Sequence, residues 1–333
     1  MNIQKLSIKL FLFVLILVLV SACSSKSTTN TDEKSKENFP EKSIELVIPY
    51  PAGGATDLIF RMVAKEAEEH LGQSIVPTNM EGGSATVGSR HVKDAKPDGY
   101  TILGSHQGIG TVNVAGIVDY SFEEFEPIAL LTRTPHFFAI RGDMGLKSLD
   151  DVKGFVEENP GQLNLSFIPG ITDHFFTAQL INSMGLSMDD INQVSFDGTA
   201  GQVNALVAGD IDGAMMDVPS ARAYLEEAKE MYPVAVTHSE RMKYWDQVPT
   251  TVEQGFEMVN SVDRGLFAPK GTPEEIIIAL EEAFQKVLED PEIQEIIADE
   301  YGSIVDFIPH QEYKTLLDEE QQLLEELAKD MDF

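Results

Sequence analysis

Residues 44–57 decide the fold and read Ile44-Glu45-Leu46-Val47-Ile48-Pro49-Tyr50-Pro51-Ala52-Gly53-Gly54-Ala55-Thr56-Asp57. The apolar start is rich in strand-forming residues, and the two prolines end it because proline gives no N–H to a sheet. From Leu58 onward, apolar residues recur at helical spacing, at Ile59, Met62, Val63 and Ala67. The stretch therefore predicts a β-strand, a glycine loop and the start of a helix.

The glycine loop has two interpretations. Gly53 and Gly54 free the backbone to turn its amides outward where a helix begins, and these amides together with the helix dipole form an anion site. The alternative is a plain β-to-α turn in which Thr56 or Asp57 caps the helix. The loop by itself is compatible with both.

The first 38 residues predict an export signal and a tether. Two lysines precede the apolar run 10–20, and a small-residue cleavage site follows it. The tetrapeptide Val20-Ser21-Ala22-Cys23 resembles the bacterial lipobox, which implies cleavage before Cys23 and a lipid on its thiol; the alternative is an ordinary signal peptide with an incidental cysteine. Residues 24–38 carry no apolar side chain. We expect a lipoprotein signal peptide over 1–22 and a flexible tether over 23–38.

Composition limits the classes of partner. The net charge is −31, which disfavours nucleic acid because phosphate binding needs clusters of Lys and Arg. Anionic lipid head groups would also repel the chain, so a covalent lipid is needed to hold it at a membrane. Cys23 is the single cysteine, so no internal disulfide is expected. Nearly 300 residues remain after the tether, which favours two domains.

The folded part alternates strands and helices in two zones, 44–140 and 146–263, which indicates an α/β fold with parallel sheets. Signatures of catalysis are absent from the sequence: the turn 82–88 lacks the dinucleotide spacing, Ser105 lies outside a G-x-S-x-G motif, and no H-E-x-x-H occurs. The seven histidines show no metal-ligand spacing. We therefore predict that the protein is not an enzyme and that it has no metal and no cofactor.

Six stretches, taken together and in order, resemble one family. They are 48–57; Lys96-Pro97-Asp98-Gly99-Tyr100-Thr101-Ile102-Leu103; Asn159-Pro160-Gly161-Gln162-Leu163-Asn164; 201–212; Val248-Pro249-Thr250-Thr251-Val252-Glu253-Gln254-Gly255; and Phe267-Ala268-Pro269-Lys270-Gly271-Thr272-Pro273. The chain is similar over 39–333 to the extracytoplasmic substrate-binding receptors of the tripartite tricarboxylate transporter family, the Bug family. The resemblance implies a type II periplasmic binding protein, with two α/β lobes, a hinge and an interlobe cleft. Lobe 1 is expected over 39–141 and 265–333, and lobe 2 over 142–264.

The resemblance also implies a site in which one loop of each lobe grips a small carboxylate through backbone amides. Such a site would need no Lys or Arg, which suits an acidic chain. The residues that match the family's site are Tyr50, Ala52, Gly53, Gly54, Ala55, Thr56, Asp57, Ser105, His106, Ile168, Gly170, Thr172, His174, Phe196, Asp197, Gly198, Thr199, Ala200 and Asp217. For His106 and His174 the alternative is a hydrogen-bonded structural histidine.

Two departures bear on the ligand. The family often has Tyr-Lys where this chain has Phe196-Asp197, and Tyr-Gly-Ser-Pro-Gly where this chain has residues 165–170. An anionic Asp197 would repel a second carboxylate or pair with an amine. The hypothesis is therefore a monocarboxylate or an amino-acid-like ligand rather than citrate.

We expect a monomeric receptor that the lipobox-like sequence anchors through Cys23 at the outer face of the plasma membrane or in the periplasm. The family resemblance implies that it delivers its ligand to permease subunits. The first alternative is a ligand sensor that signals to a two-component sensor kinase, which a neighbouring permease gene would argue against. The second is a secreted hydrolase, which turnover of esters and its loss on Ser105→Ala would support.

Overall fold

A computed structural model describes residues 39–196, 199–217, 231–243 and 245–331. The predicted signal peptide, Cys23 and the tether lie outside the described residues, and so do Asp197 and Gly198. Within the part of the chain that is described, none of the helices has the length and apolar character needed to cross a membrane.

The first sheet contains the strand predicted from the opening stretch. Its strand order is β2-β1-β3-β9-β4, with β10 added to β4; β1, β2 and β3 are parallel to each other, whereas β9 is antiparallel to β3 and β4. Its strands are β1 (Ile44–Ile48), β2 (Ile75–Asn79), β3 (Thr101–Ser105), β4 (Phe125–Arg141), β9 (Ser261–Pro269) and β10 (Ile304–Pro309).

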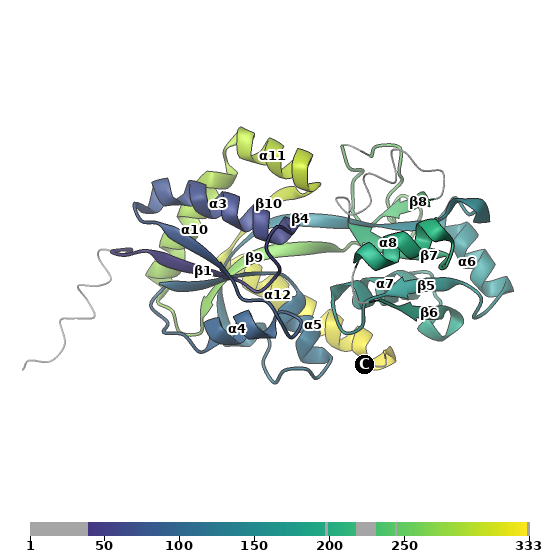
Figure 1. Cartoon of the computed structure of the whole chain (residues 1–333), viewed down its shortest axis with the longest axis horizontal. Helices are drawn as coiled ribbons and strands as arrows, with labels where there is room; N and C mark the ends of the chain where they lie inside the picture. The colour runs from purple at the N-terminus through teal and green to yellow at the C-terminus, as the bar shows by residue number, and fades with distance from the viewer. Residues whose placement is uncertain (1–38, 197–198, 218–230, 244, 332–333) are drawn as a thin grey trace, which may run out of the picture. The chain divides into compact units, whose positions relative to one another are not determined.

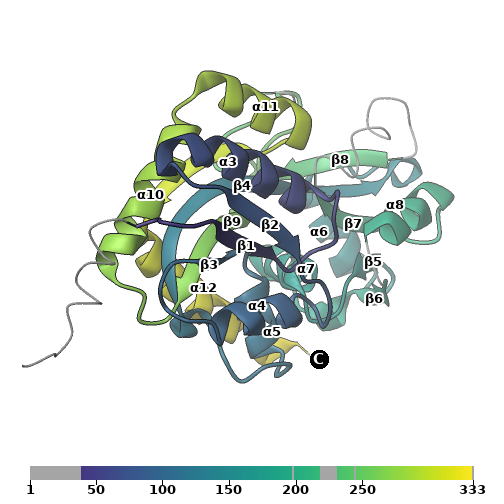
Figure 2. The same cartoon turned by 60° about the vertical axis from the view of Figure 1, so that its left-hand side comes forward.

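Helices cover both faces of this sheet (Figures 1 and 2). On one face lie α3 (Ala55–Leu71) and α10 (Glu274–Leu288), with α11 (Pro291–Tyr301) beside them. On the other lie α4 (Thr86–Lys93), α5 (Gly108–Val114) and α12 (His310–Leu327). Successive residues of a strand point to opposite faces of the sheet. Val47 and Leu103 pack with α4, α5 and α12, whereas Gly104 lies against the Phe60 ring of α3.

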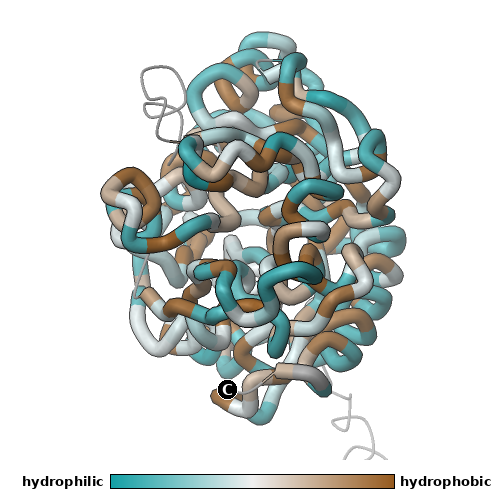
Figure 3. The backbone as a smooth tube through the Cα atoms, turned by 90° about the vertical axis from the view of Figure 1, so that its right-hand side faces the viewer, coloured by the Kyte–Doolittle hydropathy of each residue, from teal (hydrophilic) through white to brown (hydrophobic). Residues whose placement is uncertain are grey.

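The second sheet has the order β8-β4-β7-β5-β6. Its further strands are β5 (Asn164–Phe167), β6 (Asn192–Ser195), β7 (Gly213–Asp217) and β8 (Met231–Val236). Helices α6 (Leu149–Glu158) and α7 (Thr172–Ser183) pack on the face that carries Phe138 and Ile140, and α8 (Thr199–Ala208) packs on the face of Phe137 and Ala139. The alternation of hydrophilic and hydrophobic residues along the helices is visible in Figure 3.

Strand β4 belongs to both sheets. Its residues Phe125–Pro135 pair with β9, and its residues His136–Arg141 pair with β7 and β8. Because β9 brings the chain back into the first sheet, the tail from α10 to α12 rejoins that sheet through β10. The end of α12 also contacts α7, since Leu324 and Leu327 pack with Phe175. The prediction of a two-lobed α/β fold is confirmed.

Four short 3-10 helices complete the described elements. They are η1 (Phe122–Glu124), η2 (Gly142–Met144), η3 (Met188–Asp190) and η4 (Ala328–Asp330).

Candidate functional site

A cavity of about 820 Å³ opens where the carboxyl ends of strands from both sheets meet. The first sheet contributes Tyr50 after β1 and His106 after β3, and the second contributes Ile168 after β5 and Asp217 at the end of β7. Ligand sites of open α/β sheets lie at such strand ends. We call this cavity the cleft, and its two walls the α3 side and the α7 side after the helices that begin there.

On the α3 side, the loop after β1 leads into a helix with an unfilled N-terminus. The N-cap of α3 is Gly54, and no side chain caps the helix. The interpretation that Thr56 or Asp57 is the N-cap is therefore wrong. Gly53 has φ +85°, a left-handed conformation that favours glycine. The first amides of α3 have no acceptor within the helix, so this end of the helix can bind an anion.

The carboxylate of Asp57 stabilises the loop. It accepts hydrogen bonds from Gly53 N, Asn79 Nδ2 and Arg61 Nε, each at 2.8 Å. Burial raises the pKa of Asp57, but these donors and the Arg61 charge outweigh burial and leave that pKa below its usual value. Asp57 lines the cleft at only 2 % exposure. Its oxygens are thus already occupied by the residues that shape the loop.

Tyr50 and His106 form a neutral stacked pair in the cleft. The ring centroids are 4.4 Å apart, and the planes differ by 14°. Burial raises the pKa of Tyr50 to about 12 and lowers that of His106 to about 3, with Arg264 and His136 also disfavouring a charged His106. The Tyr50 hydroxyl shares a hydrogen bond of 3.0 Å with Ser105 Oγ. Ser105 is fully buried behind Tyr50 and does not line the cleft.

Arg264, on β9, is the main cleft residue that the sequence did not single out. It is 4 % exposed, its Nε donates to Thr56 Oγ1 at 3.0 Å, and its Nη1 donates to Thr134 Oγ1. Burial lowers the pKa of Arg264 to about 10, with Asp217, Tyr50 and Asp263 opposing that effect, so the guanidinium is charged at neutral pH. The cleft thus contains an arginine, although a site built from backbone amides would need none. The signal available in the sequence was an arginine within the apolar segment of a strand that runs between the two sheets.

On the α7 side, Asp173 has the opposite electrostatics to Asp57. Its carboxyl accepts from Ile168 N at 3.0 Å and from Gln202 Nε2 at 3.1 Å, and both donors are neutral. Burial raises the pKa of Asp173 to about 7 despite these hydrogen bonds. Gln202 is fully buried, and its Oε1 has no partner among the described residues. A protonated Asp173 can donate to that oxygen once the Gln202 amide turns over.

Two further histidines lie near the α7 side, His174 behind its wall and His136 in the cleft. His174 is buried, its ring lies 4.3 Å from that of Phe167, and its Nδ1 accepts from Gly170 N at 3.5 Å. Burial lowers the pKa of His174 to about 4. His136 of β4 pairs with Asp217 of β7, and both line the cleft. Burial also lowers the pKa of His136 to about 4, although the Asp217 charge opposes that shift.

The structure thus brings most of the predicted site residues to one cavity. The predicted residues that line it are Tyr50, Gly54, Ala55, Thr56, Asp57, His106, Ile168, Thr172, Phe196, Thr199 and Asp217. Those that do not are Ala52, Gly53, Ser105, Gly170, His174 and Ala200. Arg264, His136 and Asp173 join the set from the structure. Among the described residues, no group of three or more His, Cys, Asp or Glu is placed to hold a metal ion.

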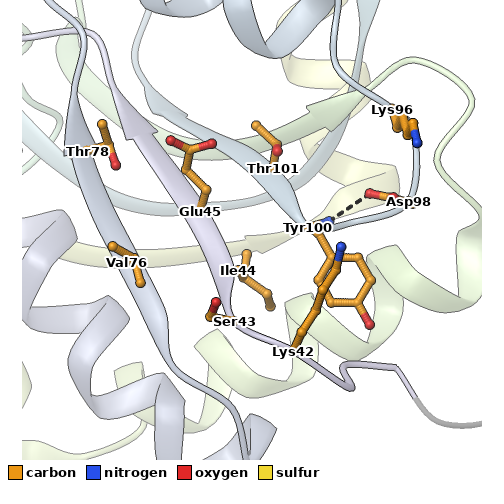
Figure 4. Close-up of a pocket in the computed structure, with 10 residues that line it drawn as sticks. All are labelled: Lys42, Ser43, Ile44, Glu45, Val76, Thr78, Lys96, Asp98, Tyr100 and Thr101. Carbon is orange, nitrogen blue, oxygen red and sulfur yellow. Dashed lines mark hydrogen bonds between the residues drawn. The ribbon is translucent and has the colours of Figure 1, made fainter.

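A second hollow, of about 490 Å³, lies at the opposite, amino end of β1 (Figure 4). It is bounded by Lys42 and Tyr100, with the Lys42 ammonium 4.3 Å from the Tyr100 ring centroid. Asp98 Oδ1 accepts from Tyr100 N at 3.2 Å. Lysine and acidic side chains alternate around it, and it lies at the amino end of the strand, away from the helix start. It is therefore a weaker candidate than the cleft.

Comparison with known proteins identifies the class as a solute-binding receptor with two α/β lobes. A TctC solute-binding protein from Polaromonas is 25 % identical with a TM-score of 0.77, covering 88 % of this chain and 100 % of that one. The malate-bound MatC of Rhodopseudomonas palustris is 29 % identical with a TM-score of 0.70, covering 87 % and 100 %. Rpa4515 of R. palustris, solved with adipate, is 26 % identical with a TM-score of 0.73, covering 88 % and 98 %.

The family follows from the sequence match. The model of the tripartite tricarboxylate transporter family receptors matches residues 59–332. The chain belongs to this family, and the type II periplasmic binding-protein fold expected from the resemblance is confirmed. Its relatives are extracytoplasmic binding receptors rather than enzymes.

Proposed function

We propose that this protein binds a small carboxylate in the cleft and delivers it to the membrane permease subunits of a tripartite tricarboxylate-type transporter. The observation that carries the proposal is the uncapped N-terminus of α3, which opens into a cavity of about 820 Å³. Two related structures hold malate and adipate, which are both small carboxylates. The cavity volume lies in the range of small-molecule sites.

A thermal-shift panel with acetate, L-malate, adipate and citrate tests the binding. Specific binding to the folded state stabilises it by about 2.7 kcal/mol when the ligand is at 100 times its Kd. We expect at least one carboxylate to raise the Tm while sodium chloride at equal ionic strength does not. If no carboxylate in the panel binds in calorimetry, the proposed function is wrong.

The choice among carboxylates depends in part on Asp197. An anionic Asp197 that acts on the ligand, as the family resemblance implies, would favour a monocarboxylate or an amino-acid-like ligand over citrate. Calorimetry on the wild type and on Asp197→Asn tests this hypothesis. We expect the substitution to improve the affinity for citrate relative to acetate; unchanged relative affinities would contradict it.

We further propose that the two lobes, 39–141 with 265–333 and 142–264, close about β4 and β9 when the ligand binds. Support comes from the two strands, which run between the sheets (Figure 1), and from the cleft, which both sheets line. Small-angle scattering should then give a smaller radius of gyration with a saturating carboxylate than without it. An unchanged radius at saturation would contradict closure.

The proposal includes a lipid anchor on Cys23, after removal of residues 1–22, and a monomeric receptor tethered by residues 23–38. The basis is the lipobox-like sequence before Cys23. In the bacterial host, we expect metabolic labelling with palmitate to mark the wild type and to fail for Cys23→Ala. The variant should also be lost from the membrane fraction. Equal labelling of the two proteins would rule out the anchor.

A further inference from the structure

The two strands that connect the sheets each carry an arginine. Strands β4 and β9 run antiparallel and side by side between the sheets (Figure 1), with Arg133 paired with Asp263 and Thr132 with Arg264 in the register. Consecutive residues of a strand point to opposite faces. Arg264 accordingly lines the cleft, whereas Asp263 and Arg133 line a separate hollow of about 240 Å³ on the other face.

Arg133 has carboxylate partners. Its Nη1 lies 3.3 Å from Asp263 Oδ2, and its Nε lies 2.7 Å from Asp306 Oδ2. A partly buried guanidinium that meets two carboxylates has its charge compensated within the protein. Arg133 thus has a structural role that the chain itself fulfils.

Arg264 is more deeply buried and has no such partner. Among the described residues, no carboxylate oxygen lies within ion-pair distance of its guanidinium, and both of its hydrogen-bond acceptors are threonine hydroxyls. Within the same part of the chain, its Nη2 has no hydrogen-bond partner. Asp217 on β7 is near enough to favour the charged form without forming an ion pair with it. Burying a guanidinium without an ion-paired carboxylate is costly, so this arrangement is complementary to an anion.

The guanidinium lies beside the helix end described above. Its Nε reaches Thr56, which is in the first turn of α3, where the amides lack acceptors and Gly54 supplies no side-chain cap. The helix dipole and the guanidinium therefore direct positive potential to one point of the cleft. The planar, forked donors of arginine match a carboxylate in particular.

We propose that Arg264 is a specificity-determining residue that binds a carboxylate of the ligand at the N-terminus of α3, and that the charge left uncompensated in the free protein is compensated by the ligand. This inference rests on the proposed function. The other titratable residues of the α3 side do not offer a competing cation, because Tyr50 and His106 are neutral. Arg264 therefore favours a ligand with a carboxylate over the same ligand with an uncharged amide in its place.

Arg264→Met tests the inference, with Arg133→Met as the matched control. Removing one member of a buried charge pair costs about 2–4 kcal/mol of binding, which corresponds to roughly 30- to 1,000-fold. With acetate, L-malate and adipate as probes, we expect Arg264→Met to weaken binding by that factor. Arg264→Lys should bind with intermediate affinity, since it keeps the charge and loses the fork. Arg133→Met should change affinity less than threefold.

Ligand-free stability separates a binding role from a structural one. Without a carboxylate, Arg264→Met should melt at or above the wild-type Tm because it removes an uncompensated buried charge, whereas Arg133→Met should melt lower. Unchanged affinity in Arg264→Met would overturn the inference and leave the proposed function intact. A ligand-free loss of stability as large as that of Arg133→Met would also overturn it. A wild type that binds none of the probes would instead refute the proposed function, and the inference with it.

Discussion

Asp57 and Asp173 occupy comparable places on the two sides of the cleft, yet their surroundings move their pKa values in opposite directions. Each lies in the first turn of a helix, lines the cleft and is less than a tenth exposed. Asp57 has a lowered pKa because hydrogen bonds from Gly53 N, Asn79 and Arg61, with the Arg61 charge, outweigh burial. Asp173 meets only neutral donors, so burial raises its pKa to about 7. Burial alone does not fix the charge of a cleft carboxyl; the direction of its pKa shift depends on whether hydrogen bonds and nearby charge outweigh burial.

This difference assigns distinct roles to the two sides. On the α3 side the aspartate is neutralised by Arg61 outside the cleft, which leaves the helix end and Arg264 to attract an anion. On the α7 side Asp173 Oδ1 accepts from the amide of Ile168, which precedes the helix, and the described cleft residues there include no arginine. We therefore expect the anionic part of a ligand to bind on the α3 side.

Asp57→Asn should have the largest effect. The substitution removes the ion pair with Arg61 and places an amide donor among three donors, so a buried N–H loses its acceptor. We expect a loss of about 3 kcal/mol in the free energy of unfolding, measured with urea at pH 8. Arg61→Gln is the control and should cost less, because Arg61 is partly exposed and Asp57 keeps its other donors. A loss below 1 kcal/mol for Asp57→Asn would remove the contrast between the two sides.

Asp173→Asn should have the opposite sign and depend on pH. Because the folded-state pKa of about 7 exceeds the unfolded value, the folded wild type binds more protons between about pH 4 and 7 and loses stability as pH rises through that window. Asparagine does not titrate. We expect Asp173→Asn to match the wild type near pH 4 and to be the more stable protein at pH 8, in urea unfolding at both pH values. A difference that is independent of pH would contradict the raised pKa.

The elements near the opening stretch were predictable because they depend on neighbours in sequence. The strand, glycine loop and helix of residues 44–57 follow from local propensity and spacing, and β1 and α3 form there. Arg264 was not predictable, since its contact with Thr56 joins residues 208 positions apart. The charge of Asp173 depends likewise on Gln202, 29 residues away on another helix. Local pattern thus predicts where the helix ends lie, and long-range packing sets their electrostatics.

Alanine substitutions at Gly53 and Gly170 test whether the two sides also differ in backbone strain. Both glycines have a positive φ, at +85° and +70°, and an added Cβ meets nothing closer than 3.7 Å at either position. The cost therefore comes from the left-handed backbone alone, about 1 kcal/mol for each substitution. Urea unfolding should give equal losses within error. A difference above 1 kcal/mol would show that the sides differ in more than electrostatics.

The smallest effect is expected at the histidines, where the two sides are alike. His106 stacks on Tyr50 and His174 on Phe167, and burial lowers the pKa of His106 to about 3 and that of His174 to about 4. Both rings therefore stay neutral in the folded protein above about pH 5. Ring-proton NMR should show no shift at either residue between pH 8 and 5.5, while the same protein in urea titrates near pH 6.5.

A lowered histidine pKa also has a consequence for stability. Below about pH 6.5 the two histidines bind protons in the unfolded chain, whereas their buried rings in the folded protein do not. The free energy of unfolding therefore decreases as the pH falls from about 6.5. His174→Asn should therefore lose less stability than the wild type when the pH falls from 6.5 to 5. Between pH 7 and 8 the substitution should not change how stability depends on pH. A titration midpoint above pH 5.5 for either ring would mean that its side of the cleft is open to water or holds an anion that stabilises the charged ring. In that case the two histidines would not be alike, and the assignment of the anion to Arg264 would be wrong.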